Sequence, residues 1–304
     1  MINNKSKYVI TILGGDKRQS VIAQKLLARG HTVKIYGLGE ITSTITGAEI
    51  CSSLEKAMAG CDVIILPLPV SRDNLTLLIQ CEQTVPILLS YIIDLATKNG
   101  CKLIVGGMIP REMLRVAEIE GITVADFYLN ELLQRKNALA SAEGAVMISM
   151  EHTEKTVCGS KMLVCGFGRI GSRLATMLTS LGADVIIAAR SDAALCEASM
   201  CGYESIRIGD DKVELSKTAS ECDVIFNTVP AVIFNENILR AMKSKPLYIE
   251  IASSPGGIDI RAARECGMSV IFAPSIPGRY APISAGEYLF DTIKEILIKR
   301  GVNI

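Results

Sequence analysis

The sequence has no excess of charge of either sign. It contains 32 lysine and arginine residues and 32 aspartate and glutamate residues, which gives a formal net charge of zero at pH 7. A protein without a global electrostatic field does not attract nucleic acid, an anionic membrane or a strongly acidic partner. We therefore expect no nucleic-acid or membrane partner, and a small substrate that is recognised locally.

Long hydrophobic runs are also missing. No apolar stretch approaches the roughly 20 residues that a membrane span needs, and Met1–Lys7 is polar, unlike a secretory leader. The sequence therefore predicts a cytoplasmic protein. With 304 residues, of which 49% are hydrophobic and 21% charged, the chain is too apolar for disorder and long enough for two domains.

Histidine is scarce, and the cysteines lack the spacing of a metal site. The two histidines, His31 and His152, lie far apart, and none of the ten cysteines belongs to a Cys-x-x-Cys pair. Zinc sites commonly need such groupings. We predict no metal and buried, reduced thiols, and nothing in the local sequence supports cysteine–histidine catalysis. His152 is expected to flank the end of a helix.

Apolar strands followed by a turn and an amphipathic helix recur in both halves of the chain, a pattern typical of parallel sheets covered on both faces. The expected strands are Tyr8–Leu13, Thr32–Tyr36, Asp62–Leu66, Lys102–Val105, Thr123–Phe127, Lys161–Cys165, Ala183–Ala189, Asp223–Asn227, Leu247–Ile251 and Ser269–Phe272. A local repeat relates the halves, since Cys61–Ile65 before Pro67 resembles Cys222–Phe226 before Pro230. We predict an α/β fold with two doubly wound parallel-sheet domains joined by a long helix.

Two helical segments organise these domains. Leu129–Met150 has no proline and has apolar residues near helical spacing, and Ser284–Arg300 carries an apolar stripe. The expected parts are an N-terminal α/β domain (1–130), a linker helix (131–155), a Rossmann dinucleotide-binding domain (156–283) and a C-terminal helix (284–304) that returns to the first domain. A ligand cleft is expected between the two domains.

A glycine-rich run follows the first strand of the second half. Gly166-Phe167-Gly168-Arg169-Ile170-Gly171 has G-x-G-x-x-G spacing, follows an apolar strand and opens an amphipathic helix, which is the context of a dinucleotide site. Gly166 is expected to allow the tight turn, Gly168 the approach of a pyrophosphate, and Gly171 close packing of helix on strand. We predict that all six residues form the cofactor site; the alternative is a tight turn without a ligand.

Two further segments concern the identity of the cofactor. NAD-selective proteins carry a carboxylate at the end of the second strand, where this sequence has Ala189-Arg190-Ser191. Because arginine and a hydroxyl suit a 2′-phosphate, we predict NADP, with NAD as the alternative and Arg190 as a solvated cation in that case. Thr228-Val229-Pro230 ends another strand and is expected at the same site.

The equivalent turn of the first half, Gly14-Gly15-Asp16-Lys17-Arg18, lacks the second and third spaced glycines. We expect no dinucleotide there. Asp16 and Arg18 should nevertheless lie at the carboxyl end of the first strand and line the cleft.

Candidate acid–base groups are few. Glu143, in the linker helix, is either a base or a solvated surface carboxylate, and Glu250 interrupts a strand, where we prefer a structural hydrogen bond to a neighbouring turn. Two loops rich in proline, glycine and serine, Ser253–Gly257 and Ala273–Arg279, are expected at the ligand-binding edge. No histidine follows His152, which disfavours the reaction of D-2-hydroxy-acid dehydrogenases, whose catalytic histidine comes late in the chain.

Motifs spread over the whole chain together resemble one family. They are Leu13-Gly14-Gly15-Asp16-x-Arg18-Gln19, Glu143-Gly144-Ala145, Glu151-His152-Thr153, Gly166–Gly171, Ala189-Arg190-Ser191, Asn227-Thr228-Val229-Pro230, Ala252-Ser253-Ser254-Pro255-Gly256-Gly257 and Pro277-Gly278-Arg279-Tyr280-Ala281-Pro282. On these residues the chain is similar, from end to end, to the A-subunit family of the dipicolinate synthases of spore-forming bacteria. It departs from that family's pattern at Gly106-Gly107-Met108, where a more polar turn is expected.

The resemblance implies an NAD(P)-linked oxidation in the mother cell during sporulation. The substrate would be dihydropyridine-2,6-dicarboxylate, or the hydroxylated tetrahydro precursor that yields it by losing water, and the product would be pyridine-2,6-dicarboxylate. The flavoprotein-like B-subunit of dipicolinate synthase is the implied partner, and a homo-oligomer is compatible with the resemblance. The expected donors to this small dicarboxylate are Ser253, Ser254, Arg279 and the backbone N–H groups of Gly256-Gly257 and Gly278.

A proton must leave the ring as the hydride departs, and Glu143 is the candidate base. Two other functions remain open. One is an NADP-dependent dehydrogenase of another small amino or imino acid, and the other is a non-catalytic dinucleotide-binding subunit.

Overall fold

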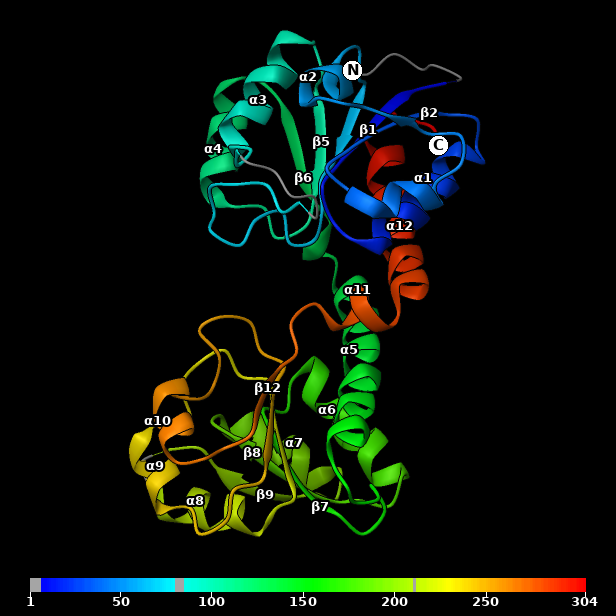
Figure 1. The fold of residues 1–304 in the computed structure, drawn as a ribbon. Coiled ribbons are helices and arrows are strands. Elements are labelled where there is room, and N and C mark those ends of the chain that lie inside the picture. The colour runs from blue at the N-terminus through cyan, green and yellow to red at the C-terminus, as the bar shows by residue number, and fades with distance from the viewer. Residues whose placement is uncertain (1–6, 80–84, 210–211) are drawn as a thin grey trace. The chain divides into compact units, whose positions relative to one another are not determined.

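The computed structural model describes residues 7–79, 85–209 and 212–304. The chain forms two compact units. Unit 1 contains the described residues up to Lys136 together with Ala281–Ile304, and unit 2 is Asn137–Tyr280. Within the described residues, each unit has one parallel sheet of six strands with helices on both faces (Figure 1). The predicted α/β fold with two doubly wound sheets is confirmed.

The sheet of unit 1 has the strand order β3-β2-β1-β4-β5-β6, and its neighbouring strands are parallel. The elements of unit 1 are β1 (Val9–Leu13), α1 (Lys17–Leu27), β2 (Thr32–Tyr36), the 3₁₀ helix η1 (Gly39–Thr44), β3 (Glu49–Ile50), α2 (Leu54–Met58), β4 (Val63–Ile65), α3 (Leu89–Lys98), β5 (Leu103–Gly106), α4 (Arg111–Ile119), β6 (Thr123–Asp126), the 3₁₀ helix η2 (Phe127–Leu129) and α12 (Pro282–Lys299). The order reverses between β1 and β4, and doubly wound folds commonly bind ligands at the carboxyl ends of strands at such a point.

The C-terminal helix α12 packs beside α1, although the two are far apart in the sequence. Buried residues of α1, α12 and the sheet form one hydrophobic core, and Lys25 pairs with Glu287 at 3.0 Å. A Cβ on Gly286 would lie 2.7 Å from Cβ of Val21, so glycine is needed where the helices meet. Helices α2, α3 and α4 contribute to the second core, on the other face.

Unit 2 repeats this strand order as β9-β8-β7-β10-β11-β12, again with parallel neighbours. Its elements follow α5 (Glu131–His152), which begins in unit 1, and are β7 (Lys161–Cys165), α6 (Arg169–Ser180), β8 (Asp184–Ala189), α7 (Asp192–Met200), β9 (Glu204–Arg207), α8 (Lys212–Glu221), β10 (Val224–Asn227), α9 (Glu236–Ala241), β11 (Leu247–Glu250), α10 (Ile260–Glu265), β12 (Val270–Phe272) and α11 (Ile276–Tyr280). The reversal falls between β7 and β10, which carry the glycine-rich run and Thr228-Val229-Pro230 at their carboxyl ends.

The two sheets are also equivalent in atomic detail. Oδ2 of Asp62 accepts a hydrogen bond from the backbone N–H of Val9, and Oδ2 of Asp223 accepts one from Lys161, both at 2.9 Å. Each aspartate also donates its own N–H to the carbonyl of that same residue. Each therefore ties the start of the fourth strand to the start of the first, and the repeat seen in the sequence is a structural one.

All ten predicted strands are present, and their ends differ from the prediction by at most one residue. The sequence does not predict β3 or β9, the edge strands that pair with the second strand of each sheet. β3 has two exposed residues, and in β9 Ile206 is the one buried residue, so neither strand has an apolar run that would reveal it. The helix α5, Glu131–His152, begins and ends two residues later than the predicted helical segment Leu129–Met150, and it ends three residues before the end of the predicted linker 131–155.

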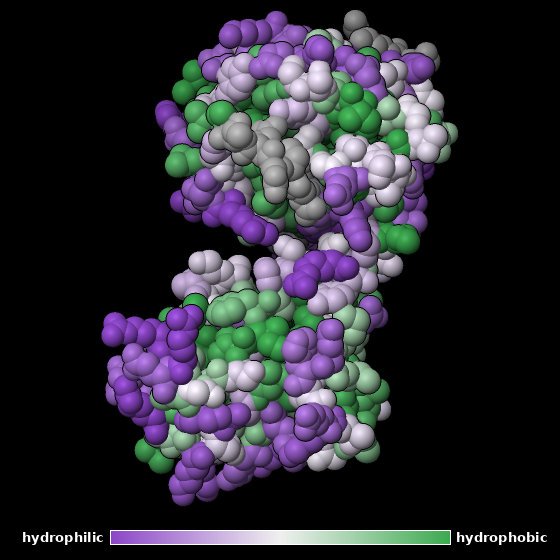
Figure 2. Space-filling model, in the orientation of Figure 1, coloured by the Kyte–Doolittle hydropathy of each residue, from purple (hydrophilic) through white to green (hydrophobic). Residues whose placement is uncertain are grey.

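Figure 2 shows hydrophilic and hydrophobic residues mixed on the visible face of each unit. Among the described residues, no helix combines the length and the apolar character needed to cross a membrane.

The expected burial of the thiols is only partly correct. The buried cysteines are Cys51, Cys61, Cys101, Cys165 and Cys222. Cys158, Cys196 and Cys201 are exposed, and the last two lie on or just after α7, a helix that buries only Ala198. Cys81 lies outside the described residues.

Candidate functional site

The turn between β7 and α6 needs glycine at two positions for reasons internal to the chain. Gly166 has φ +95°, and a Cβ there would lie 2.4 Å from Oγ1 of Thr228. A Cβ on Gly171 would lie 1.9 Å from the carbonyl oxygen of Gly166. Gly166 therefore makes the tight turn and Gly171 lets the helix approach the turn, as predicted from their spacing.

Gly168 differs from both. Its φ is −90°, which any residue adopts, and among the described residues nothing lies within 4 Å of a Cβ placed there. It is exposed and stands at the N-cap of α6, where it makes no side-chain cap bond. The open side of Gly168 therefore offers room beside a helix N-terminus, which fits the pyrophosphate of a dinucleotide.

The other residues of this run have different environments. Phe167 is 7% exposed, and its ring packs edge-on against Tyr203 with centroids 5.7 Å apart, so its side chain belongs to the core. Arg169 is exposed and Ile170 is partly exposed. A ligand at this turn would therefore meet the backbone of Phe167 rather than its ring.

The end of β10 is tied to the end of β7. Thr228 donates both its backbone N–H and its hydroxyl to the carbonyl of Cys165, at 2.9 and 2.8 Å. Val229 N–H donates to Oδ1 of Asn227 at 3.1 Å, and Pro230 is exposed. The structure thus brings Thr228-Val229-Pro230 beside Gly166, with the Thr228 hydroxyl proton already used within the chain.

Two residues that the sequence analysis did not identify, Arg207 and Asp192, lie next to the end of β8. Arg190 is exposed, and the hydroxyl of Ser191 caps α7 by accepting the N–H of Ala194 at 3.3 Å. Arg207, on the unpredicted strand β9, donates to the carbonyl of Arg190 at 2.9 Å and pairs with Asp192. A second cation and a carboxylate therefore lie next to Arg190, and the pairing of β8 with β9 brings the cation there.

Glu250 is buried at the end of β11, with 3% of its surface exposed. Its carboxylate accepts the N–H groups of Gly257 at 2.7 Å and Ala252 at 3.1 Å, and the Asn227 amide at 2.7 Å. Burial raises the pKa of this carboxyl, and these hydrogen bonds oppose the rise. The predicted structural bond to a neighbouring turn is therefore confirmed, and it fixes the loop that contains Ser253 and Ser254.

The loops expected to bind substrate present side chains more than backbone donors. Ser253, Ser254 and Arg279 are exposed. The N–H groups that we expected to be free are not, because Gly256 donates to Ser253, Gly257 to Glu250 and Gly278 to Ser275. In this conformation any donors to a carboxylate in these loops would therefore be the hydroxyls and the guanidinium.

Glu143 is exposed on the part of α5 that belongs to unit 2. The next residue, Gly144, packs on α11: a Cβ there would lie 2.2 Å from Cγ2 of Ile276 and 3.2 Å from the ring of Tyr280. The helix of Glu143 and the segment of Gly278 and Arg279 are therefore in direct contact within one unit.

The corresponding turn of unit 1 is filled by the chain itself. The N–H of Gly15 donates to the carbonyl of Leu78 at 3.0 Å, and that oxygen would lie 2.3 Å from a Cβ on Gly14. Arg18 is 4% exposed, makes two bonds of 2.8 and 2.7 Å to Asp16, and donates to the carbonyl of Leu68 at 2.5 Å. These two residues form an internal ion pair, where we expected them to line a cleft.

Nδ1 of His152 lies 2.9 Å from the carbonyl of Ile148, so this histidine ends α5 as predicted. Within the described ranges, no group of three or more histidine, cysteine, aspartate or glutamate side chains could hold a metal ion.

Comparison with known proteins relates each unit to a family. Residues 9–128 match the N-terminal domain of the dipicolinate synthase A-subunit, and residues 122–255 match the NAD-binding domain of D-isomer-specific 2-hydroxyacid dehydrogenases. Unit 2 thus carries a nicotinamide-dinucleotide domain of the dehydrogenase type.

Relatives extend over nearly the whole chain. The dipicolinate synthase A-subunit of Bacillus subtilis is 28% identical over 95% of both chains. The crystal structure of that protein has a TM-score of 0.78 over 96% of both chains. The dipicolinate synthase A-subunit of Bacillus halodurans is 26% identical, with a TM-score of 0.79 over 98% of this chain and 99% of that one. Residues 9–128 therefore carry the N-terminal domain of a dipicolinate synthase A-subunit, and the chain as a whole resembles that protein from end to end.

Proposed function

We propose that the protein oxidises dihydropyridine-2,6-dicarboxylate, or its hydroxylated tetrahydro precursor with loss of water, to pyridine-2,6-dicarboxylate with NADP as the electron acceptor. The observation that carries this proposal is the open glycine turn of unit 2, in a chain that resembles the dipicolinate synthase A-subunit over 95% of its length. Aromatisation supplies driving force, so the protein mainly has to position the ring and remove a proton.

The cofactor would be held by the Gly166–Gly171 turn and by the ends of β8 and β10. The N–H groups of the first turn of α6 would bind the pyrophosphate beside Gly168. Arg190 and Ser191 would receive the 2′-phosphate of NADP, because the strand ends in an arginine and a hydroxyl instead of a carboxylate. The bound nucleotide would supply the acceptor for the hydride that leaves the substrate ring.

The substrate-facing groups would be the exposed side chains of Ser253, Ser254 and Arg279, which can donate to carboxylates. Gly278 would contribute to the shape of the substrate site but would donate no hydrogen bond, because its N–H already donates to the carbonyl of Ser275. Glu143, on the helix that packs against this segment, would take the proton that leaves the ring.

The relatives are named as one subunit of a synthase, which implies a second. We propose that this second component is the flavoprotein-like B-subunit, in the mother-cell cytoplasm of a sporulating bacterium. A homo-oligomer is compatible with this proposal.

The test uses the purified chain alone with NADP⁺ and dihydropyridine-2,6-dicarboxylate. We expect NADPH and pyridine-2,6-dicarboxylate to form in equal amounts, with no reaction with alanine or a 2-hydroxy acid. Turnover of alanine, but not of the dihydropyridine, would favour a dehydrogenase of small amino acids. Cofactor binding without turnover of any of these substrates would favour a non-catalytic subunit.

A further inference from the structure

A pocket of about 380 Å³ lies in unit 1, at the carboxyl ends of β5 and β6, away from the turn that Leu78 fills. Its lining includes Asn74, Met108, Arg111, Tyr128, Leu129 and Gln134. Nothing in the proposed reaction uses it. The carboxyl edge of a parallel sheet is the edge where such folds bind ligands.

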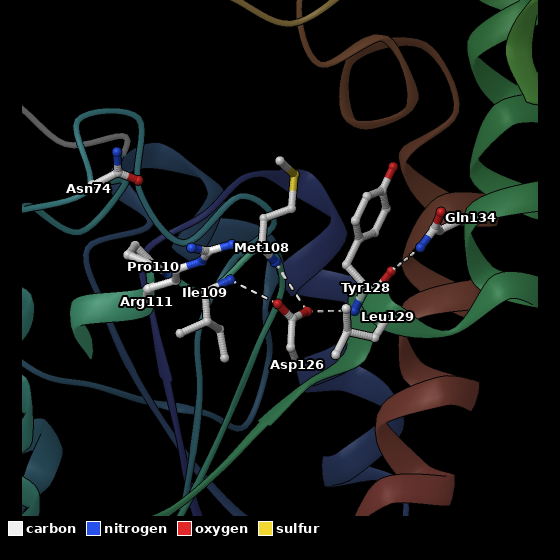
Figure 3. Close-up of a pocket in the computed structure, with 9 residues that line it drawn as sticks. All are labelled: Asn74, Met108, Ile109, Pro110, Arg111, Asp126, Tyr128, Leu129 and Gln134. Carbon is white, nitrogen blue, oxygen red and sulfur yellow. Dashed lines mark hydrogen bonds between the residues drawn. The ribbon is translucent and has the colours of Figure 1, made fainter. Parts of the chain in front are cut away.

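Asp126 holds the two loops that form this pocket. Its carboxylate accepts the N–H groups of Met108 at 3.1 Å, Ile109 at 2.9 Å and Tyr128 at 2.8 Å (Figure 3). A Cβ on Gly107 would lie 2.5 Å from the ring of Phe127, so the loops also meet closely beneath these bonds. The pocket is therefore built by the fold, and the one carboxylate in its lining already has three donors.

The cation of the pocket has no such partner. Arg111 is the first residue of α4, and within the described ranges its guanidinium has no ion pair or hydrogen bond. Arg115, one turn further along the same helix, pairs with Glu112 at 2.6 Å. The N-terminus of α4 adds positive potential beside Arg111. An anion that enters the pocket would therefore meet a charge that no other described group satisfies.

The remaining walls suit a flat ring. Met108 is 50% exposed and Leu129 is 80% exposed, and in Figure 3 the side chains of Met108 and Tyr128 extend to the same side, away from Asp126. Large apolar side chains left in solvent beside polar groups often mark a binding surface. Gln134 donates its amide N–H to the carbonyl of Tyr128 at 2.6 Å, which links α5 to the Tyr128 side of the pocket.

We propose that this pocket binds a small planar carboxylate, with the carboxylate on Arg111 and the ring against Met108, Tyr128 and Leu129. An arginine fork matches a carboxylate in two parallel hydrogen bonds. The choice of pyridine-2,6-dicarboxylate as the probe rests on the proposed function, and the site itself is complete within unit 1.

The test titrates the full chain, labelled at its methionine methyl groups, with pyridine-2,6-dicarboxylate, and with pyridine as a ring that has no carboxylate. We expect the dicarboxylate to shift the Met108 methyl signal, assigned with Met108→Leu, and pyridine not to shift it at the same concentration. Arg111→Gln should weaken binding about 10- to 150-fold in calorimetry, the range for loss of charge-assisted hydrogen bonds. Arg111→Lys should fall in between, and the matched control Arg115→Gln should bind like the original chain.

Two results would overturn the site. One is binding that leaves the Met108 methyl signal unmoved, and the other is equal affinity in Arg111→Gln and the original chain. The turnover assay separates this from the proposed reaction. Turnover of the dihydropyridine without a shift of the Met108 methyl signal would contradict the proposed pocket and support the proposed reaction. A shift of the Met108 methyl signal that depends on Arg111, in a chain that shows no turnover, would contradict the proposed reaction and support the proposed pocket.

Discussion

The glycine turns after β1 and β7 occupy the same place in two sheets of the same strand order, but one is closed and the other is open. In unit 1 the carbonyl of Leu78 bonds Gly15, and the side chain of Asp16 caps α1. In unit 2 the equivalent N-cap residue is Gly168, and no described atom lies within 4 Å of a Cβ placed there. Strand order alone therefore does not create a dinucleotide site. The turn must also keep an open face at the N-terminus of its helix.

The carboxyl edges of the two sheets also differ in where they place charged side chains. Unit 1 neutralises its buried arginine with Asp16 in the turn itself. Unit 2 has one charged residue in its Gly166–Gly171 turn, the exposed Arg169, and buries Glu250 at the end of β11, where backbone N–H groups satisfy it. In unit 1 an ion pair that stabilises the fold therefore fills the point where the strand order reverses. In unit 2 the same point remains available to a ligand.

The largest expected effect concerns α5, which begins in unit 1 and continues in unit 2. Glu143→Gln keeps the size of the side chain but removes the proposed base, so turnover of the dihydropyridine should fall about 10²- to 10⁴-fold while NADP affinity holds. Glu131→Gln, on the unit 1 part of the same helix, should leave turnover within a few-fold. Equal turnover in both variants would mean that Glu143 is a solvated surface carboxylate and not the base.

The closed turn should matter for stability alone. Arg18→Met leaves Asp16 without its partner, and breaking a buried pair in this way typically costs about 3–5 kcal/mol of unfolding free energy. Urea denaturation measures this change, and adding Asp16→Asn should recover part of it. NADP affinity should be unchanged in the folded protein. Its loss would mean that the unit 1 turn takes part in cofactor binding.

The end of β8 should decide cofactor preference. Arg190→Asp removes a phosphate partner and supplies a carboxylate for the ribose, so NADP binding should weaken by about 1.5–3 kcal/mol while NAD binding improves. Calorimetric titration with each nucleotide measures both changes. Arg300→Asp makes the same charge change in unit 1 and should alter neither affinity. If both nucleotides bind the original chain equally and Arg190→Asp changes nothing, Arg190 is a surface cation.

The smallest expected effect is the pH dependence that Glu250 gives to the unfolding free energy. Burial raises its pKa in the folded state above the ordinary value of 4.5, so the folded state holds this proton more tightly. That contribution to stability is complete below about pH 4.5 and is lost as the pH rises through the raised pKa. The unfolding free energy of the original chain should therefore fall relative to Glu250→Gln as the pH rises. A difference between the two that does not change with pH would contradict this assignment.

The sequence predicts most of this arrangement where the signal is local. The strands with apolar runs, the β7–α6 turn and the roles of Gly166 and Gly171 depend on neighbouring residues, and the structure agrees with them. The closure of Gly14 by Leu78 depends on a contact between residues distant in the chain. Likewise, Arg207 reaches Arg190 only through an edge strand with one buried residue. Such contacts leave no periodic pattern in the sequence.

The open turn of unit 2 is tested most directly by calorimetric titration of NADP into the full chain and into Gly168→Asp. The backbone at Gly168 is unstrained and its Cβ position is free, so the variant should fold with an unchanged melting temperature. The added carboxylate would face the pyrophosphate and repel it. We expect one dinucleotide per original chain and no measurable binding to the variant. Unchanged affinity in the folded variant would place the dinucleotide elsewhere and contradict the assignment of this turn.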